Sequence, residues 1–199
     1  MYRVIGKRAL DLVAALVAFP FVALIGMVVG AAIKAEDGGP VFYTGSRLGR
    51  GQVPFRMYKF RSMICDAPDI RNPDGSTFSS PSDARLTRVG RIIRATSIDE
   101  LPQILNVVRG DMSLVGPRPS PLGNEGTYTT QFTQRFVVKP GITGLAQVIL
   151  RNSGTMEDRS RLDNYYVANL SFRLDYAVVA RTIGRVLSRQ SLYRDRLPS

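Results

Sequence analysis

An uncharged apolar run covers residues 12–33. As a helix, this run would be about 33 Å long, which is enough to cross the hydrocarbon core of a bilayer. Pro20 interrupts the helical hydrogen-bond ladder in the middle of the run. A spanning helix and a re-entrant helix both fit this pattern, whereas a cleaved signal peptide would be shorter and would carry a cleavage site. Basic residues stand on both sides of the run, at Arg3, Lys7, Arg8 and Lys34, so the charge bias does not strongly favour a single crossing.

Asp11 directly precedes the apolar run. A carboxylate at the edge of a membrane helix is costly unless it is paired. Lys7 and Arg8 stand four and three residues before it, on the same helix face. We therefore interpret Asp11 as part of an ion pair at the membrane interface rather than as a catalytic group.

The pattern changes after residues 38–40, where two glycines and a proline end the apolar run. Two short stretches, 41–44 and 54–60, are rich in aromatic and β-branched residues, and a turn rich in glycine and arginine separates them at 45–52. This order predicts a β-hairpin. Residues 67–81 are rich in Pro, Asp, Asn, Gly and Ser, which predicts a surface loop.

Two further stretches combine arginines with apolar residues at helical spacing. In the first, the arginines recur every third residue between 85 and 94, which predicts a helix with one basic side. The second stretch, 178–189, predicts an amphipathic helix that can lie on an anionic surface, with an ordinary solvated face as the alternative. The arginines are Arg85, Arg88, Arg91 and Arg94 in the first stretch and Arg181, Arg185 and Arg189 in the second.

The amino-acid composition limits the kinds of ligand and of catalysis that the chain can support. The chain has 199 residues, of which 44% are apolar and 22% charged, so it is long and apolar enough to bury a core. Its net charge of +11 indicates an anionic partner, and the preference for arginine over lysine favours phosphate recognition unless it reflects a GC-rich genome. The absence of histidine excludes Ser-His and Cys-His catalysis and every His-ligated metal. Carboxylates, lysine, tyrosine or a hydroxyl must carry any acid–base or nucleophilic step.

The segment 97–119 holds the strongest candidate for chemistry, the adjacent pair Asp99 and Glu100. One interpretation is a capping box, in which Ser97 and Glu100 only decorate the start of a helix. Pro102 argues against it, because a proline costs a helix nothing in its first turn. Placing Asp99 near the N-cap satisfies that condition, so the sequence favours both carboxylates at the mouth of a helix.

A carboxylate at a helix mouth has chemical consequences. The helix N-terminus and nearby Arg94 favour its ionised form. An ionised Asp99 can act as a nucleophile towards phosphorus or as a hard-oxygen ligand for Mg²⁺. Lys59, Arg94 and Arg118 can neutralise the charge on a phosphoryl group in transfer.

Several motifs, in order and with matching spacing over residues 3–188, identify a resemblance to the bacterial sugar transferase family, the monotopic phosphoglycosyl transferases. They are Lys7-Arg8-x-x-Asp11, Gly39-Pro40-Val41-Phe42, Tyr58-Lys59-Phe60-Arg61-Ser62-Met63, Ser97-Ile98-Asp99-Glu100-Leu101-Pro102-Gln103, Gly110-Asp111-Met112-Ser113, Gly116-Pro117-Arg118-Pro119 and Pro140-Gly141-Ile142-Thr143-Gly144-Leu145-Ala146-Gln147-Val148.

The resemblance implies an activity and roles for the site residues. The donor would be a UDP-sugar and the acceptor undecaprenyl phosphate, with Mg²⁺ as cofactor and no nucleic acid as partner. Asp99 would be the nucleophile and the metal ligand: it attacks the β-phosphate, releases UMP and forms a sugar-phosphoryl-aspartate that the polyprenol phosphate then displaces. Glu100 would assist Asp99 or the acceptor. Lys59, Arg94 and Arg118 would bind the substrate phosphates.

The resemblance also implies a fold and a location. We expect an α+β chain, predominantly helical, with a small β-hairpin and amphipathic interfacial helices. Residues 1–36 would form a re-entrant, membrane-anchoring helix, and residues 37–199 a cytoplasmic catalytic domain on the surface of the bacterial inner membrane, in a monotopic arrangement. Family members carry a Ser-Pro break about one turn further on than Pro20, which leaves the depth and angle of the helix open.

Several questions stay open at this point. The sequence does not identify the sugar or the glycoconjugate pathway. It also does not identify the oligomeric state, for which a homodimer is one alternative. Two rival functions also remain. One is a polyprenol glycosyltransferase that releases UDP, and the other is a non-enzymatic basic membrane protein that docks on anionic lipid or nucleic acid.

Overall fold

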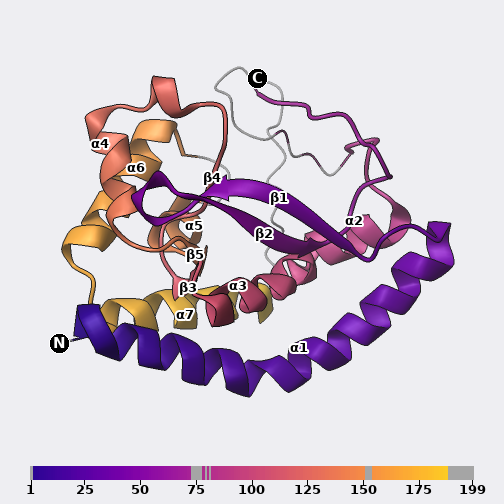
Figure 1. Cartoon of the computed structure of the whole chain (residues 1–199), viewed down its shortest axis with the longest axis horizontal. Helices are drawn as coiled ribbons and strands as arrows, with labels where there is room; N and C mark the ends of the chain where they lie inside the picture. The colour runs from indigo at the N-terminus through magenta and orange to yellow at the C-terminus, as the bar shows by residue number, and fades with distance from the viewer. Residues whose placement is uncertain (1, 73–77, 79, 81, 151–153, 188–199) are drawn as a thin grey trace.

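The computed structural model describes residues 2–72, 78, 80, 82–150 and 154–187. It confirms a predominantly helical chain with a few short strands (Figure 1). The helices are η1 (Tyr2–Gly6), α1 (Lys7–Asp37), η2 (Arg50–Gln52), α2 (Arg88–Ala95), η3 (Ile98–Gln103), α3 (Ile104–Arg109), η4 (Glu125–Thr127), α4 (Thr130–Thr133), η5 (Gln134–Val137), α5 (Leu145–Leu150), α6 (Met156–Ala168) and α7 (Phe172–Leu187). The strands are β1 (Phe42–Leu48), β2 (Pro54–Phe60), β3 (Ser113–Val115), β4 (Ser120–Pro121) and β5 (Gly141–Thr143).

The apolar run lies within α1, one α-helix of 31 residues that continues through Pro20 and ends at Asp37, and the following Gly38 has a φ of +71°. Its length and its mean hydropathy of 2.8 over an 18-residue window suffice to cross a membrane, and only 11% of that window is buried. Side chains such as Leu16, Phe21 and Met27 are exposed. The helix is bowed, with both ends turned towards the rest of the chain (Figure 1). Its middle therefore presents an apolar surface directed away from the domain.

The first turns of α1 are tied to the domain by Asp11, which is buried. Its carboxylate accepts hydrogen bonds from the Ser113 Oγ at 2.7 Å and the Leu114 N–H at 3.2 Å. The predicted ion pair of Asp11 is confirmed in part: Lys7 lies 3.9 Å from Asp11, but its closer partner is Asp175, to which it donates at 2.7 Å. The contact with β3 could not be predicted because it joins residues about a hundred positions apart.

Arg8 is not a partner of Asp11. Its guanidinium donates to the carbonyl oxygens of Val107 and Val108, at 2.6 and 3.0 Å. These carbonyls belong to the last turn of α3, where a cation compensates the negative end of the helix dipole. Arg8 therefore ties α1 to α3.

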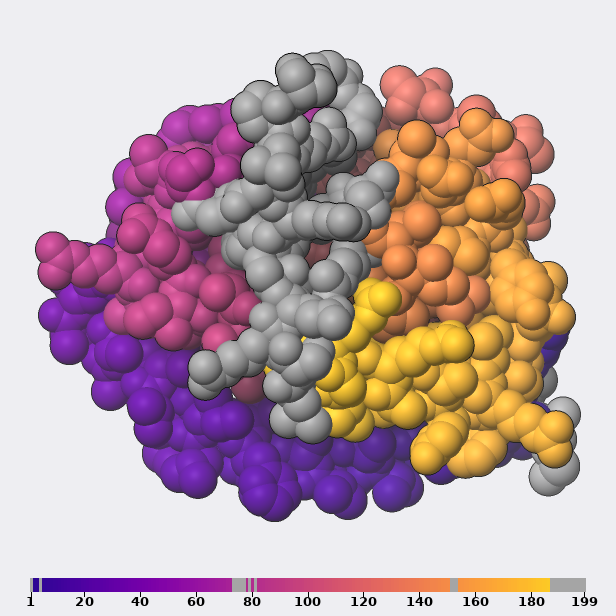
Figure 2. All heavy atoms as spheres, turned by 180° about the vertical axis from the view of Figure 1, so that it is seen from behind, coloured from indigo at the N-terminus to yellow at the C-terminus, as the bar shows by residue number. Residues whose placement is uncertain are grey.

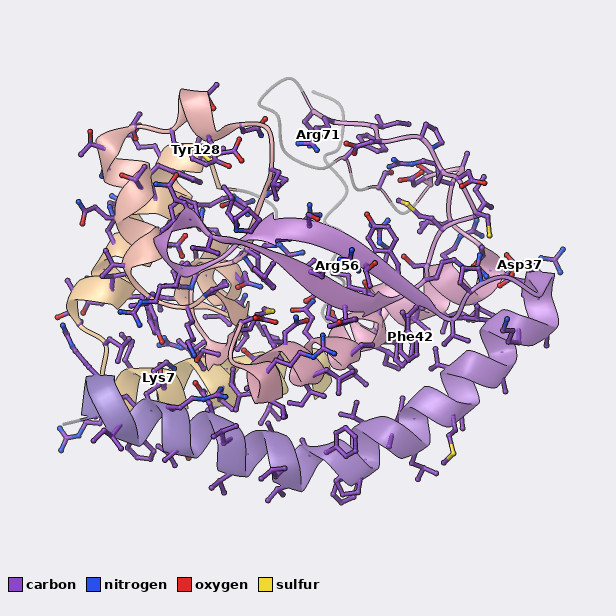
Figure 3. The ribbon with its side chains drawn as sticks, in the orientation of Figure 1. Lys7, Asp37, Phe42, Arg56, Arg71 and Tyr128 are labelled. Carbon is purple, nitrogen blue, oxygen red and sulfur yellow. The ribbon has the colours of Figure 1, made fainter. Side chains whose placement is uncertain are left out.

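The C-terminal end of α1 is tied to the same domain. Asp37 forms a two-pronged ion pair with the buried Arg61, with oxygen–nitrogen distances of 2.5 and 2.7 Å. Glu36 accepts hydrogen bonds from the first backbone N–H groups of α2. Lys7 and Asp37 mark these two ends in Figure 3.

The predicted hairpin is confirmed: β1 and β2 pair antiparallel from Phe42 opposite Phe60 to Leu48 opposite Pro54. The first strand is longer than predicted and continues to Leu48, where β4 pairs with its other edge. The fully buried Asn106 of α3 covers the edge of β2. Its Oδ1 accepts from the Tyr58 N–H at 3.0 Å, and its Nδ2 donates to the Arg56 oxygen at 2.7 Å. This side chain fixes the hairpin beside α3.

The two arginine-rich stretches are confirmed in part. The first helix, α2, begins at Arg88, so Arg85 stands outside it and pairs with the buried Asp83 at 2.6 Å. The second, α7, lies beside α1 (Figure 2) and exposes an apolar stripe that includes Phe172, Tyr176 and Ile183. Arg189 and residues 73–77, 79 and 81 of the predicted loop lie outside the described residues.

The contact between α1 and β3 makes a prediction about stability. Replacing Asp11 by Ala leaves the Leu114 N–H without its partner and the Ser113 hydroxyl with only the Val115 carbonyl oxygen, and we expect a loss of about 2 kcal/mol in the free energy of unfolding. Asp11→Asn keeps one acceptor oxygen and should lose less. Unfolding in detergent micelles measures both, with the exposed Glu157→Ala as control. A wild-type stability for Asp11→Ala would refute the role assigned to this contact.

Candidate functional site

The structure brings all five predicted site residues together, from four different segments. Lys59 lies on β2, Arg94 on α2, Asp99 and Glu100 on η3, and Arg118 just after β3. The Lys59 Nζ lies 2.7 Å from the Glu100 Oε1 and 3.9 Å from the Asp99 Oδ2. The Arg118 Nη2 lies 3.1 Å from the same Glu100 oxygen. The site is therefore a carboxylate pair surrounded by cations, above the C-terminal half of α1.

The carboxylate pair sits in the first turn of the 3-10 helix η3, and α3 begins only at Ile104. Ser97 has a φ of +57° and its side chain makes no capping hydrogen bond, so the capping-box interpretation is wrong. The placement of both carboxylates near a helix start is confirmed, but the argument from Pro102 is wrong in detail, because Ser97 is the N-cap and Pro102 lies inside η3 rather than in its first turn. Ile98 and Leu101 pack on a cluster that includes Val29 and Ile33 of α1, and this packing fixes the turn.

Asp99 is the less compensated of the two carboxylates. Its residue is only 5% exposed, and no hydrogen bond to its carboxylate is found among the described residues. Burial raises the pKa of Asp99, although Lys59 and Arg94 act in the opposite direction. The sequence predicts that the surroundings of Asp99 favour its ionised form. This prediction is wrong, because desolvation outweighs the cations. A raised pKa makes the ionised oxygen a stronger base and a better nucleophile.

Glu100 behaves in the opposite way. Burial alone would raise its pKa, but the charges of Lys59 and Arg118 and their hydrogen bonds lower the pKa of Glu100 to about 2. This carboxylate stays ionised at every physiological pH and is no source of protons. It holds the Lys59 ammonium and the Arg118 guanidinium on one oxygen, which fixes both cations beside Asp99.

Arg94 approaches the pair from the last turn of α2. Its Nη1 is buried and has no hydrogen-bond partner among the described residues. Its charge nevertheless lowers the pKa of Asp99. A buried N–H without a partner is costly, and an anion that accepts from it removes that cost.

Arg118 is positioned by a close approach of backbones. A Cβ at Gly116 would lie 2.5 Å from the Lys139 oxygen, and one at Gly144 would lie 2.2 Å from the Gly116 oxygen. Only glycine fits at these two positions. Gly116 stands at the start of the segment that carries Arg118, and Gly144 packs against Gly116. The same segment forms the turn that follows the parallel pair β3 and β5.

Two residues that the sequence reasoning missed also hold this segment. The Arg135 Nη2 donates to the Arg118 carbonyl oxygen at 2.6 Å and lies 3.0 Å from the Asp163 Oδ2. Both side chains of this ion pair are buried. Nothing local marks them, because Arg135 and Asp163 stand 28 residues apart in the sequence. Asn106, which fixes the strand of Lys59, was missed for the same reason.

The carboxylates of the site bear on whether it can hold a metal ion. No group of three or more Asp, Glu, Cys or His that could hold a metal is found among the described residues. Mg²⁺ does not need such a group, because it binds through one or two carboxylates together with substrate phosphates and water. Asp99 has carboxylate oxygens that are free to coordinate, whereas Glu100 is occupied by two cations. The residues present therefore fit a Mg²⁺ ion that is shared with a phosphate ligand.

Curated relatives match most of the chain. A UDP-glucose:undecaprenyl-phosphate glucose-1-phosphate transferase of Caulobacter vibrioides is 41% identical, over 94% of this chain and 72% of the relative. A UDP-N-acetylgalactosamine-undecaprenyl-phosphate N-acetylgalactosaminephosphotransferase of Aeromonas hydrophila is 39% identical, over 92% of this chain and 44% of the relative. The uncharacterised sugar transferase EpsL of Bacillus subtilis is 42% identical, over 94% of this chain and 89% of the relative.

The fold and the site define a class of protein in which two carboxylates, surrounded by cations that can bind an anion, pack on a long apolar helix. The particular family follows from the sequence profile for bacterial sugar transferases, which matches residues 1–189. The chain belongs to the bacterial sugar transferase family.

The opposite pKa shifts of the two carboxylates predict opposite effects on stability. The pKa of Asp99 is raised above its value in the unfolded chain, so its ionised form costs folding free energy above that pKa, and the cost vanishes as the pH falls through it. We expect Asp99→Asn to raise the melting temperature near neutral pH, with a gain that shrinks on acidification.

Glu100 provides the matched contrast. Its pKa is lowered from 4.5 to about 2, so its ionised form stabilises the fold above the unfolded pKa, and this contribution is lost between these two values. We expect Glu100→Gln to lower the melting temperature near neutral pH. Thermal unfolding of both variants in detergent micelles at neutral and acidic pH measures the difference. Equal losses in the two variants would contradict the assignment.

Proposed function

We propose that this chain transfers a sugar-1-phosphate from a UDP-sugar to undecaprenyl phosphate, and that Asp99 carries the sugar-phosphate between the two. The observation that supports this proposal is the buried Asp99 carboxylate, which has no hydrogen-bond partner among the described residues but lies in the field of Lys59, Arg94 and Arg118. The Caulobacter and Aeromonas relatives are named for transfers of this kind.

The proposed reaction has two displacements at one phosphorus atom. In the first, an Asp99 oxygen attacks the β-phosphorus of the donor, and the bond from that phosphorus to the bridging oxygen breaks, so that UMP leaves with the bridging oxygen. In the second, a phosphate oxygen of undecaprenyl phosphate attacks the same phosphorus and displaces the Asp99 carboxylate. The product is undecaprenyl-diphosphate-sugar, and Asp99 is regenerated.

The cations have a defined task in both displacements. Negative charge gathers on the phosphoryl oxygens in each transition state, and preorganised cations stabilise it without having to move. Lys59 and Arg118 are held in place by Glu100, and Arg94 has a buried N–H that is free to donate. Glu100 therefore acts by orienting cations, since its low pKa leaves it no proton to give.

Asp99 is also the residue that would hold Mg²⁺, together with the donor diphosphate. When bound, the ion supplies positive charge that screens the diphosphate and favours the departure of UMP. Coordination also favours the ionised form of Asp99, against the effect of burial. Its neighbour Glu100 remains engaged with Lys59 and Arg118.

The placement of the site suits a lipid acceptor. The turn that carries Asp99 packs on the C-terminal half of α1 through Ile98 and Leu101. Both ends of α1 are tied to the same polar domain, and we infer from this a re-entrant helix and a monotopic arrangement on the cytoplasmic face of the inner membrane. The apolar stripe of α7 would then lie in the interface beside α1.

The nucleotide product tests the proposed reaction. Purified protein with Mg²⁺, undecaprenyl phosphate and a panel of UDP-sugars should release UMP, and without acceptor it should release about one UMP per enzyme because the aspartyl intermediate accumulates. Asp99→Asn should abolish both releases. Release of UDP would instead identify a glycosyltransferase, and full turnover by Asp99→Asn would exclude a covalent role for this residue.

The topology has its own test. An epitope placed before Met1 and the exposed thiol of Cys65, which lies near the C-terminal end of α1, should both be accessible in inverted inner-membrane vesicles and both be protected in spheroplasts. The reason is that a re-entrant helix leaves both of its ends on one side. Accessibility of the two probes from opposite sides would show a spanning helix and refute the monotopic arrangement.

A further inference from the structure

The last turn of α1 contacts the start of α2 through Glu36, a residue outside the site described above. The Glu36 Oε1 accepts the N–H of Arg88 at 2.6 Å, and its Oε2 accepts the N–H of Val89 at 3.0 Å. These are the first two N–H groups of α2, which have no partner within a helix. A carboxylate at this end is also favoured by the helix dipole. A side chain of the apolar helix therefore caps the helix that carries Arg94.

The rest of α2 is fixed by packing around this cap. Thr87 accepts the N–H of Gly90, and a Cβ at Gly90 would lie only 1.9 Å from the Ser62 oxygen. Ile93 is buried in a cluster with Val29 and Ile33 of α1. With its first turn capped and its middle wedged between α1 and the end of β2, α2 behaves as a short rigid rod.

Arg94 stands in the last turn of this rod, next to the buried Ile93. Its Nη1 is buried without a hydrogen-bond partner among the described residues, so no other side chain holds that end of the guanidinium. Its place relative to Asp99 is then set by where α2 begins along α1. A shift of one end of the rod moves the guanidinium by a similar amount, and a misplacement of about 1 Å can cost a large factor in rate.

We propose that Glu36 is a positioning residue for the reaction: its carboxylate fixes α2 on the apolar helix and thereby places Arg94 beside Asp99. This inference rests on the proposed function, because it assigns Arg94 to the transferring phosphate. It also gives α1 a part in catalysis besides anchoring, since the same helix residue joins the membrane helix to the element that carries a phosphate ligand.

A double-mutant cycle tests the proposal. Glu36→Gln keeps the length of the side chain but leaves one acceptor oxygen for two N–H donors, and we expect kcat/KM for UMP release to fall about fivefold. The loss should divide between KM and kcat as it does for Arg94→Ala. In an Arg94→Ala background, Glu36→Gln should have no further effect, because its action passes through Arg94. The matched control is Glu157→Gln, an exposed glutamate in the first turn of α6, which should leave both backgrounds unchanged.

Hydrogen exchange gives a second readout that does not depend on activity. The amides of α2 should exchange faster in Glu36→Gln and at the wild-type rate in Glu157→Gln. Unchanged protection of α2, or equal losses of activity in both backgrounds of the cycle, would overturn the proposal. If the wild-type protein releases no UMP, the proposed function fails, and the exchange result then decides by itself whether Glu36 fixes α2.

Discussion

The structure depends on polar contacts that tie an apolar helix to a polar domain at both of its ends. Near the N-terminal end, Asp11 is buried and accepts two hydrogen bonds from residues of β3. Near the C-terminal end, Asp37 grips the buried Arg61 just after β2. Each element that carries a cation of the site lies next to one of the ends of α1. Lys59 is on β2, just before Arg61, and Arg94 is on α2, whose first N–H groups bind Glu36. Arg118 follows β3, which binds Asp11. The helix is thus a common base for parts of the site that are far apart in sequence.

The chemistry depends on two neighbouring carboxylates having different surroundings. Side chains of successive residues in a helical turn point in different directions, so Glu100 meets Lys59 and Arg118 at hydrogen-bond distance while Asp99 stays 3.9 Å from the nearest cation. The nearby cations therefore lower the pKa of Glu100, whereas burial is the largest influence on the pKa of Asp99 and raises it. In the proposed reaction, this separation assigns Glu100 to hold the cations and Asp99 to react.

The sequence predicted the parts of this arrangement that have local signals. Stretches rich in aromatic and β-branched residues on both sides of a glycine-rich turn predicted the hairpin, and the segment around Pro102 predicted that the carboxylates lie near a helix start. Their charge made Lys59 and Arg118 candidates for phosphate binding, the resemblance to the family supported the same role, and the structure places both at Glu100. Contacts between distant residues left no such signal. Arg135 with Asp163 and Glu36 with the start of α2 connect positions 28 and about 52 residues apart, and no spacing rule relates them. The partner of Asp11 was missed for the same reason, since a nearby cation is the default expectation for a carboxylate.

The contacts at its two ends also support the proposed re-entrant helix over a helix that spans the membrane. A helix that crossed the bilayer would carry its ends to opposite sides, so one set of contacts with the domain would have to break. Releasing Asp11 would leave the Leu114 N–H without its partner, and releasing Asp37 would leave the buried guanidinium of Arg61 without its counter-charge, bonded only to the carbonyl oxygens of Pro40 and Met63. The bowed helix keeps both sets and still turns its apolar middle away from the domain (Figure 1). Pro20 lies within this middle, where its missing N–H makes bending less costly. The polar ends and the apolar middle are therefore satisfied together when the helix enters one leaflet and returns, and a straight crossing satisfies only the middle.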